Sequence, residues 1–175
     1  MIRLFWVSLW VSIVQMGFLA SCQSPASKMP KPGSSLEEQA TIFIRSMVGF
    51  DIETSVDCMM PEYVEQMGGR ESVLAIYAKD VKQYKEDGYK LSNGKVDQPS
   101  AYSKCNGTLQ CVLRQRVTME MTRSGSEPFE MEANLIAISS DNGLTWKFLQ
   151  PGEENLQSLR QKFPILCEDL VLRKY

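Results

Sequence analysis

The stretch Cys111-Val-Leu-Arg-Gln-Arg-Val-Thr-Met-Glu-Met-Thr122 decides the fold of this 175-residue chain. From Cys111 to Met121 every second residue is apolar except Gln115, and most residues between them are charged or hydroxylated. A period of two is typical of a β-strand that buries one face and exposes the other. The stretch therefore predicts a long strand of an antiparallel sheet, with an inward row interrupted at Gln115.

The residues on both sides of this strand predict an antiparallel meander. Asn106-Gly107 is a strong hairpin signal, and Asp141-Asn142-Gly143 has the composition of a turn. The expected strands are residues 89–96, about 100–104, the long strand that starts near Asn106, a strand with apolar residues at every second position from Phe129 to Ala137, and a short strand with Trp146 and Phe148.

The alternation of inward and outward side chains predicts how the two longest strands pair. A three-residue loop, residues 124–126, would place Met121 opposite Phe129, so that inward residues meet inward residues along both strands. The same register sets Glu120 opposite Glu130, which is a destabilising pair of like charges.

The outward faces of these strands carry a local apolar cluster made of Val112, Ile136 and Ile138. The expected register places Val112 opposite Ile138. An exposed cluster of β-branched side chains requires a cover. Two covers are available: a second copy of the domain in a homodimer, or the apolar tail from Ile165 to Leu172. The tail is favoured because it is tethered and has the higher effective concentration.

Three helices are expected before the sheet and one after it. Ser35 and Glu38 form a capping box at the start of the first helix. Asp51 is placed to cap a shorter second helix, and Gly88 lies where a left-handed residue would end the third. The expected helices run from about residue 35 to 49, from 52 to about 60, from about 71 to 87 and from 156 to about 163.

Helices followed by a long antiparallel meander predict an α+β fold. This order resembles the nuclear transport factor 2-like, or SnoaL-like, cone, in which a curved sheet wraps the helices around a pocket. Four stretches also resemble uncharacterised lipoproteins of Bacteroidetes type: Glu65-Gln-Met-Gly-Gly-Arg-Glu71, Leu109-Gln-Cys-Val112, Leu135-Ile-Ala-Ile-Ser-Ser-Asp-Asn-Gly-Leu-Thr-Trp-Lys-Phe148 and Leu159-Arg-Gln-Lys-Phe-Pro164. The resemblance covers most of residues 35–172. It implies a fold and a compartment and brings no catalytic residues.

The N-terminus has the composition of an export signal. Arg3 supplies a positive charge, residues 4–19 are largely apolar, and Leu19-Ala20-Ser21-Cys22 resembles the bacterial lipobox. That resemblance implies cleavage before Cys22 and attachment of lipid to its thiol, which would anchor the protein to a membrane. A single transmembrane anchor and a secretory signal without lipid are the alternatives.

This interpretation divides the chain into three parts. Residues 1–21 are expected to be a lipoprotein signal peptide, residues 22–34 a flexible tether rich in Pro, Ser and Lys, and residues 35–175 the SnoaL-like α+β domain. Gln23 stands where enterobacterial lipoproteins retained in the inner membrane carry Asp. We therefore expect a lipid anchor in the outer membrane, facing the periplasm.

Composition excludes several classes of function. The chain contains no histidine, so it lacks the usual general base near neutral pH and the commonest zinc ligand. Its formal net charge is -2, and no block of like charges forms the basic face that a nucleic-acid binder requires. We expect no nucleic acid partner, no metal site and no cofactor.

Four cysteines remain after lipidation of Cys22 and allow three pairings in an oxidising compartment. The tight turn at Asn106-Gly107 makes a bridge between Cys105 and Cys111 geometrically poor. The favoured interpretation is that all four are buried free thiols that behave as small apolar side chains. The four are Cys58, Cys105, Cys111 and Cys167.

Polar residues on apolar faces are the candidates for a binding site. Gln115 interrupts the inward row, and the expected cone would direct helical side chains toward it. The predicted pocket is shallow and takes a small apolar ligand. Its candidate residues are Gln115, Asp57, Tyr63, Tyr77, Tyr84 and Trp146. The alternative is that Gln115 forms hydrogen bonds within a closed core.

Three functions remain open. A lipid-anchored binding or interaction module of the cell envelope is preferred, because no nucleophile, base and orienting group occur as a set. A pocket enzyme of lyase or isomerase type would use Asp57 and tyrosines, with the pKa of the carboxyl raised inside the pocket. A structural envelope lipoprotein without a ligand is the third.

Overall fold

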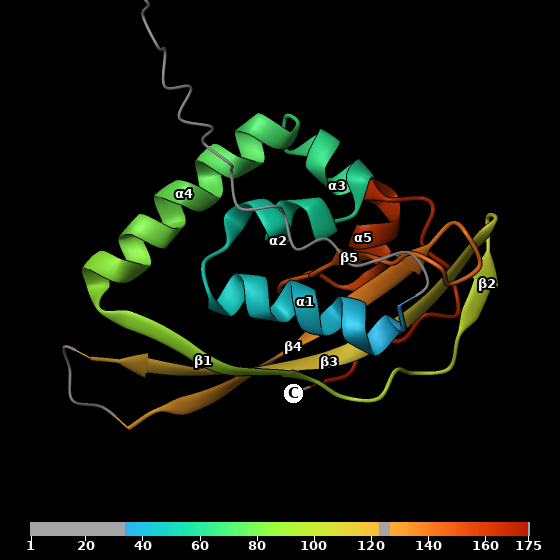
Figure 1. Cartoon of the computed structure of the whole chain (residues 1–175). Helices are drawn as coiled ribbons and strands as arrows, with labels where there is room; N and C mark the ends of the chain where they lie inside the picture. Colours follow the sequence, from blue (N-terminus) through green and yellow to red (C-terminus); the bar gives the residue numbers. More distant parts are fainter. Residues whose placement is uncertain (1–33, 123–126, 175) are drawn as a thin grey trace, which may run out of the picture.

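A curled antiparallel sheet lies beneath a layer of helices, as Figure 1 shows. The computed structural model describes residues 34–122 and 127–174. The elements are α1 (Leu36–Val48), α2 (Ile52–Cys58), α3 (Pro61–Gln66), α4 (Arg70–Asp87), β1 (Tyr89–Val96), β2 (Ser103–Cys105), β3 (Thr108–Met121), β4 (Phe129–Ser139), β5 (Lys147–Leu149) and α5 (Leu156–Lys162). The predicted α+β fold with a curved antiparallel sheet is confirmed. The expected signal peptide and all of the tether except Ser34 lie outside the described residues.

The described residues contain four helices before the sheet, so the predicted number of three is wrong. The additional helix is α3, which occupies the segment expected to be a link. Pro61 begins it, at a position where a missing amide hydrogen costs no helical hydrogen bond. The amide of Val64 donates to the carbonyl of Met60. With only six residues, α3 is too short to show a helical repeat in the sequence.

The helix boundaries follow the capping residues. The Ser35 hydroxyl accepts a hydrogen bond from the Glu38 amide at 3.1 Å, and the Glu38 carboxylate accepts one from the Ser35 amide at 2.9 Å. The Asp51 carboxylate accepts from the Thr54 amide at the start of α2. Gly88 ends α4 with a φ of 81°, in the left-handed region that favours glycine. These three predicted helix boundaries are confirmed.

The sheet has the strand order β1-β3-β4-β5, and β2 pairs with the first part of β3. Asn106 and Gly107 have φ values of 48° and 74° and connect Cys105 to its partner Thr108. Two consecutive positive φ values are typical of the two-residue turn that Asn-Gly favours. The predicted hairpin is confirmed, and β1 has the expected bounds, whereas β2 is shorter than expected.

The pairing of β3 with β4 keeps the predicted parity but differs from the predicted register by two residues. Phe129 pairs with Met119 rather than with Met121. Inward residues still meet inward residues, because a shift of two preserves the face of every side chain. The predicted loop, residues 124–126, lies outside the described residues.

Charge explains why this register is preferred. Glu130 lies opposite Thr118 and not opposite Glu120, so the like-charge pair of the predicted register is absent. Arg116 lies opposite Glu132, and its guanidinium comes within 3.7 Å of the Glu130 carboxylate. The alternation of apolar side chains is the same in both registers. The pairing of charged side chains on the outer face distinguishes the two.

The inner face of the sheet packs against α1, which crosses above β3 and β4 in Figure 1. Phe43 and Phe148 stack in this core, with ring centroids 5.3 Å apart and an interplanar angle of 13°. Other deeply buried members are Ala40, Ile44, Val56, Val73, Cys111, Leu113, Leu135 and Ala137. Side chains of α1 therefore fill the concave side of the curled sheet.

α1 approaches β1 very closely at Gly94. A Cβ atom on this residue would lie 2.5 Å from Ile44 Cγ2 and 2.9 Å from Val48 Cγ2, closer than packed carbon atoms come. Gly94 lies in the irregular part of β1, between the paired residues Ser92 and Lys95. The missing side chain lets the helix lie directly on the strand.

The outer face of β3 and β4 is covered by the C-terminal part of the same chain. Val112, Ile136 and Ile138 are 0%, 0% and 6% exposed. They are not a free interaction surface, because they form a second core with α5 and the tail. Val112 lies opposite Ile136 and not opposite Ile138, as the shift of two residues requires. The covering side chains are Leu159, Phe163, Leu166, Cys167 and Leu170.

Gln110 fastens the tail to the sheet. Its side-chain amide is fully buried and donates to the Ile165 carbonyl at 2.8 Å and to the Thr108 hydroxyl at 2.7 Å. Its side-chain oxygen accepts from the Cys167 amide at 3.1 Å. The same Cys167 forms a disulfide with Cys105 at the end of β2. The disulfide and the buried hydrogen bonds of Gln110, here called the polar clamp, thus hold the tail at the same residue, Cys167.

The interpretation of four free thiols is wrong for two of the cysteines. Cys105 and Cys167 form a disulfide across 62 residues of sequence, because the tail crosses the sheet beside the end of β2. Cys58 and Cys111 are buried free thiols. Burial raises the pKa of Cys58 to about 11 and that of Cys111 to about 12, so both stay protonated at neutral pH.

Replacing Gly94 by alanine tests the close contact between α1 and β1. We expect Gly94→Ala to lower the free energy of unfolding by about 1 to 3 kcal/mol, because the new methyl group overpacks against α1. Urea denaturation measures the change. Ser92→Ala in the same strand serves as the control and should stay within about 0.5 kcal/mol of wild type. Equal stability of Gly94→Ala and wild type would contradict the described contact.

Removing the disulfide tests how firmly the tail is held. We expect the double variant Cys105→Ser, Cys167→Ser to lose about 4 kcal/mol of unfolding free energy, the value for a closed loop of this length in the chain-entropy model. Urea denaturation of the variant, and of wild type with a phosphine reductant, should give matching curves. If reduction leaves the wild-type curve unchanged, the two cysteines are not bonded to each other.

Candidate binding pocket

A cavity of about 170 Å³ lies where the helical layer meets the end of β5. Its walls are formed by Phe43, Met59, Tyr63, Tyr77, Phe148, Gln150 and Gly152. Helices α1, α3 and α4 each contribute one aromatic residue to it. The cavity is therefore complete only when the helical layer is assembled on the sheet.

Contacts at the end of β5 position one side of this cavity. Met59 pairs with Phe148 across an isolated parallel bridge, and the amide of Met60 donates to the Phe148 carbonyl at 2.9 Å. Lys147 Nζ donates to the Asp57 carbonyl, near the C-terminus of α2. The link between α2 and α3 thus continues the sheet edge and holds Met59 beside Phe148.

Tyr63 and Tyr77 place two phenols in the cavity wall, and both side chains are half-buried. Burial raises the pKa of Tyr77 to about 12, and nearby Tyr63 and Asp80 act in the same direction. Within the described residues, neither hydroxyl has a hydrogen-bond partner. Tyr77 is protonated at neutral pH and can donate a hydrogen bond to a bound molecule.

The structure brings two of the six candidate residues, Tyr63 and Tyr77, together in this cavity. Tyr84 follows on α4 but is 40% exposed, and its ring meets that of Tyr89 edge-on, with centroids 5.5 Å apart. The only buried residue that α4 contributes is Val73. Helical spacing therefore places Tyr77 and Tyr84 on one side of α4, but only the first half of the helix reaches the core.

Trp146 and Asp57 have other partners and do not line the cavity. Trp146 is buried, and its indole nitrogen donates to the Gly143 carbonyl at 3.1 Å. The Asp57 carboxylate accepts from the guanidinium of Arg70 at 3.1 Å. Among the residues that the structure describes, the walls of the cavity contain no carboxylate, thiol, amine or aliphatic hydroxyl.

Gln115 is buried on the inner face of β3, as the inward row predicted, and is 4% exposed. It does not belong to the walls of the tyrosine cavity. Its side-chain oxygen has no hydrogen-bond partner among the described residues. A buried acceptor without a partner costs free energy, so Gln115 neither forms the expected pocket nor behaves as a satisfied core group.

The deep wall of the cavity was not predicted. Phe148 was expected on the short last strand, and an apolar pattern does not separate a residue beside a cavity from one in a filled core. Met59 became part of the wall through its bridge to Phe148. Gln150 and Gly152 follow the last strand and carry no sequence signal.

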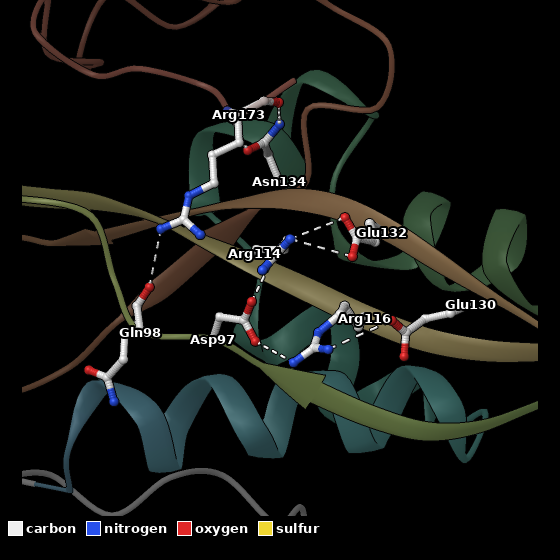
Figure 2. Close-up of polar contacts among 8 residues, drawn as sticks. All are labelled: Asp97, Gln98, Arg114, Arg116, Glu130, Glu132, Asn134 and Arg173. Atoms are coloured by element: carbon white, nitrogen blue, oxygen red, sulfur yellow. Dashed lines mark hydrogen bonds and ion pairs between the residues drawn. The ribbon is translucent and has the colours of Figure 1, made fainter. Parts of the chain in front are cut away.

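A cluster of charges on the outer face of the sheet is the second polar feature (Figure 2). Asp97 accepts hydrogen bonds from Arg114 and Arg116 at 2.6 Å each. On the other side, the two guanidinium groups come within 3.4 Å of Glu132 and 3.7 Å of Glu130. Each arginine thus has a carboxylate on both sides, and the cluster does not form a free anion site.

This charge cluster stabilises the fold near neutral pH. Hydrogen bonds from Arg114, and then from Arg116, hold the pKa of Asp97 below its usual range. A carboxyl with a lowered pKa in the folded state contributes stability above its ordinary pKa and loses it as acid protonates the group. Asn134 exchanges two hydrogen bonds with the backbone of Arg173, at 2.9 Å each, so the end of the tail joins the same region (Figure 2).

Two further cavities have polar groups in their walls, and some of these groups pair with one another or with neighbours. One of about 210 Å³ includes Asp97, which binds the two arginines. The other, of about 360 Å³, follows the junction of α1 and α2. There the Ser46 hydroxyl bonds to that of Ser55 at 2.8 Å, and the Asp51 carboxylate accepts from the Thr54 hydroxyl at 2.9 Å. The tyrosine cavity differs because it combines two phenols with three buried apolar side chains, those of Phe43, Met59 and Phe148.

Within residues 34–122 and 127–174, no helix is long and apolar enough to cross a membrane. In the same residues, no group of three or more Cys, Asp or Glu side chains could hold a metal ion. A comparison with protein-family models finds no match to the chain, and a comparison with curated proteins finds none either. The function must be inferred from the cavity and from the N-terminal motif.

The same substitution at two buried glutamines should have opposite effects. We expect Gln110→Leu to lower the unfolding free energy by about 2 to 4 kcal/mol, because it leaves the Ile165 carbonyl and the Cys167 amide without partners. Gln115→Leu should be neutral or stabilising, since it removes an unpaired acceptor and leaves an apolar group of similar size.

Urea denaturation of the two variants side by side measures this difference, and each variant is the control for the other. A loss of more than about 2 kcal/mol in Gln115→Leu would show that its side chain has partners in the core.

Proposed function

We propose that this chain is a lipid-anchored binding module of the bacterial cell envelope. Its domain would be of the nuclear transport factor 2-like, or SnoaL-like, kind, and it would hold a small ligand in the cavity between Tyr63 and Tyr77. The observation that carries this proposal is the chemistry of the cavity walls, which offer hydrogen bonds and apolar surface without a nucleophile or base.

Two independent features support the envelope location. The motif Leu19-Ala20-Ser21-Cys22 follows an apolar segment, as a lipid-attachment signal requires. The disulfide between Cys105 and Cys167 is typical of an oxidising compartment outside the cytoplasm. With Gln23 after the lipidated residue, we favour the outer membrane and the face toward the periplasm.

The walls of the cavity favour binding over catalysis. Asp57, the carboxylate on which a pocket enzyme would depend, pairs with Arg70 outside the cavity. Tyr77 has a pKa of about 12 and is a poor base near neutral pH. The chain contains no histidine, so no imidazole is available to act as the base in place of Tyr77.

A monomer is the favoured assembly. The apolar outer face of β3 and β4, which would support a homodimer, is buried under α5 and the tail of the same chain. A second copy would have to displace a cover that is bonded through Cys167 and clamped by Gln110.

Lipid labelling of the expressed full chain tests the anchor. We expect wild type to incorporate radioactive palmitate and to fractionate with the outer membrane, and Cys22→Ala to lose both, because the thiol that carries the lipid is absent. Cys58→Ala is the matched control and should keep the label. Incorporation of palmitate by Cys22→Ala at the wild-type level would place the anchor elsewhere.

A further inference from the structure

We infer that the tyrosine cavity binds an uncharged, single-ring aromatic molecule with one polar end, such as a substituted phenol. This inference rests on the proposed binding function and names the class of ligand.

The deep wall of the cavity is apolar. Phe43, Met59 and Phe148 are all buried, and the two phenyl rings stack on each other. A thioether beside aromatic rings makes favourable contacts with a further ring. A polar substituent placed against these three side chains would lose its hydration without gaining a hydrogen bond.

The polar groups belong to residues nearer the surface. Tyr63 and Tyr77 are half-buried, and Gln150 and Gly152 are exposed. A molecule that enters the cavity therefore meets hydrogen-bond donors and acceptors from the outer residues and only carbon and sulfur from the deep ones. This distribution matches a ligand with one apolar and one polar end.

The volume limits the size of the ligand. Cavities that take drug-sized molecules measure roughly 300 to 1,000 Å³. At about 170 Å³, this cavity has room for one ring with few substituents. A steroid or a fatty acyl chain would require the surrounding helices to move apart.

Charge disfavours a carboxylate as the polar end. None of the wall residues is a cation, and Asp80 lies close enough to Tyr77 to raise the pKa of its phenol. An anionic ligand would be repelled by the negative charge of Asp80, and no positively charged wall residue would offset this repulsion. A sugar is disfavoured for a different reason, since its hydroxyls surround the ring and some would face Phe43 and Phe148.

Methionine-methyl nuclear magnetic resonance of the full chain in lipid nanodiscs tests the inference, with empty nanodiscs as the blank. The probe is 4-methylphenol, and the signal of Met59, assigned with Met59→Leu, reports on the cavity. We expect a saturable shift of this signal. p-Xylene should bind about fivefold more weakly, the loss expected for one neutral hydrogen bond. Glucose and 4-methylbenzoate should give no saturable shift.

Variants separate the phenol of the cavity from a phenol elsewhere on the same helix. Tyr77→Phe should weaken 4-methylphenol about fivefold and leave p-xylene unchanged, because it removes only the hydroxyl. Tyr84→Phe, outside the cavity, should change neither. Tyr63→Phe provides a second test of the same kind if Tyr77→Phe folds poorly.

Several results would overturn the inference. They are the absence of a saturable shift at Met59, equal affinity for p-xylene and 4-methylphenol, and saturable binding of glucose or 4-methylbenzoate at Met59. The anchor is tested independently by palmitate labelling. A lipidated chain that fails to bind the probes would remove the ligand class and leave the anchor intact, and binding without lipidation would do the reverse.

Discussion

Burial of both faces of β3 at the same few residues is the constraint on which the rest of the structure depends. Val112 and Leu113 are neighbours that point to opposite faces, and both are fully buried. A strand buried on both sides needs two covers. α1 supplies the inner cover, and α5 with the tail supplies the outer one. The chain must therefore return across its own sheet after the last strand.

This return determines where the polar clamps and the disulfide occur. The tail crosses the sheet as irregular backbone, so its amide and carbonyl groups cannot pair in a regular ladder. Gln110 and Arg160 replace that ladder: Gln110 bonds to Ile165 and Cys167, and the Arg160 guanidinium donates to the carbonyls of Cys167 and Glu168 at 2.9 and 2.6 Å. The disulfide secures the same point. Side chains from β3 and α5 thus provide hydrogen-bond partners for the backbone of the tail.

Local sequence patterns predicted the parts of the fold that depend on near neighbours. The alternation from Cys111 to Met121 predicted the inward face of β3, and Asn106-Gly107 predicted the turn before it. The register with β4 was wrong by two residues, because hydrophobic parity is the same for both registers. The pairing of Cys105 with Cys167 depends on a contact across 62 residues, which no local pattern encodes.

The candidate site was likewise predicted only where it depends on local sequence patterns. Tyr77 was predicted to line the site and does line the cavity, whereas Tyr84 was assigned to the same site and is exposed. Gln115 was singled out because it is polar in an apolar row, and this signal marks burial rather than a cavity. The walls of the cavity come from elements far apart in the chain, including the link after α2 and the residues after β5. Their meeting point depends on the packing of the helical layer, which periodicity does not describe.

The cavity itself follows from the composition of α4. This helix has 18 residues but buries only Val73, because most of its other positions are polar or charged. It cannot supply enough apolar surface to fill the space beside Phe43 and Phe148, and the two half-buried tyrosines on α3 and α4 border what remains. A helix with few buried contacts opens at a lower free-energy cost than the doubly covered strands. Under the proposed binding function, we therefore expect the wall that carries Tyr77 to adjust to a ligand and the Phe43 and Phe148 side to stay in place.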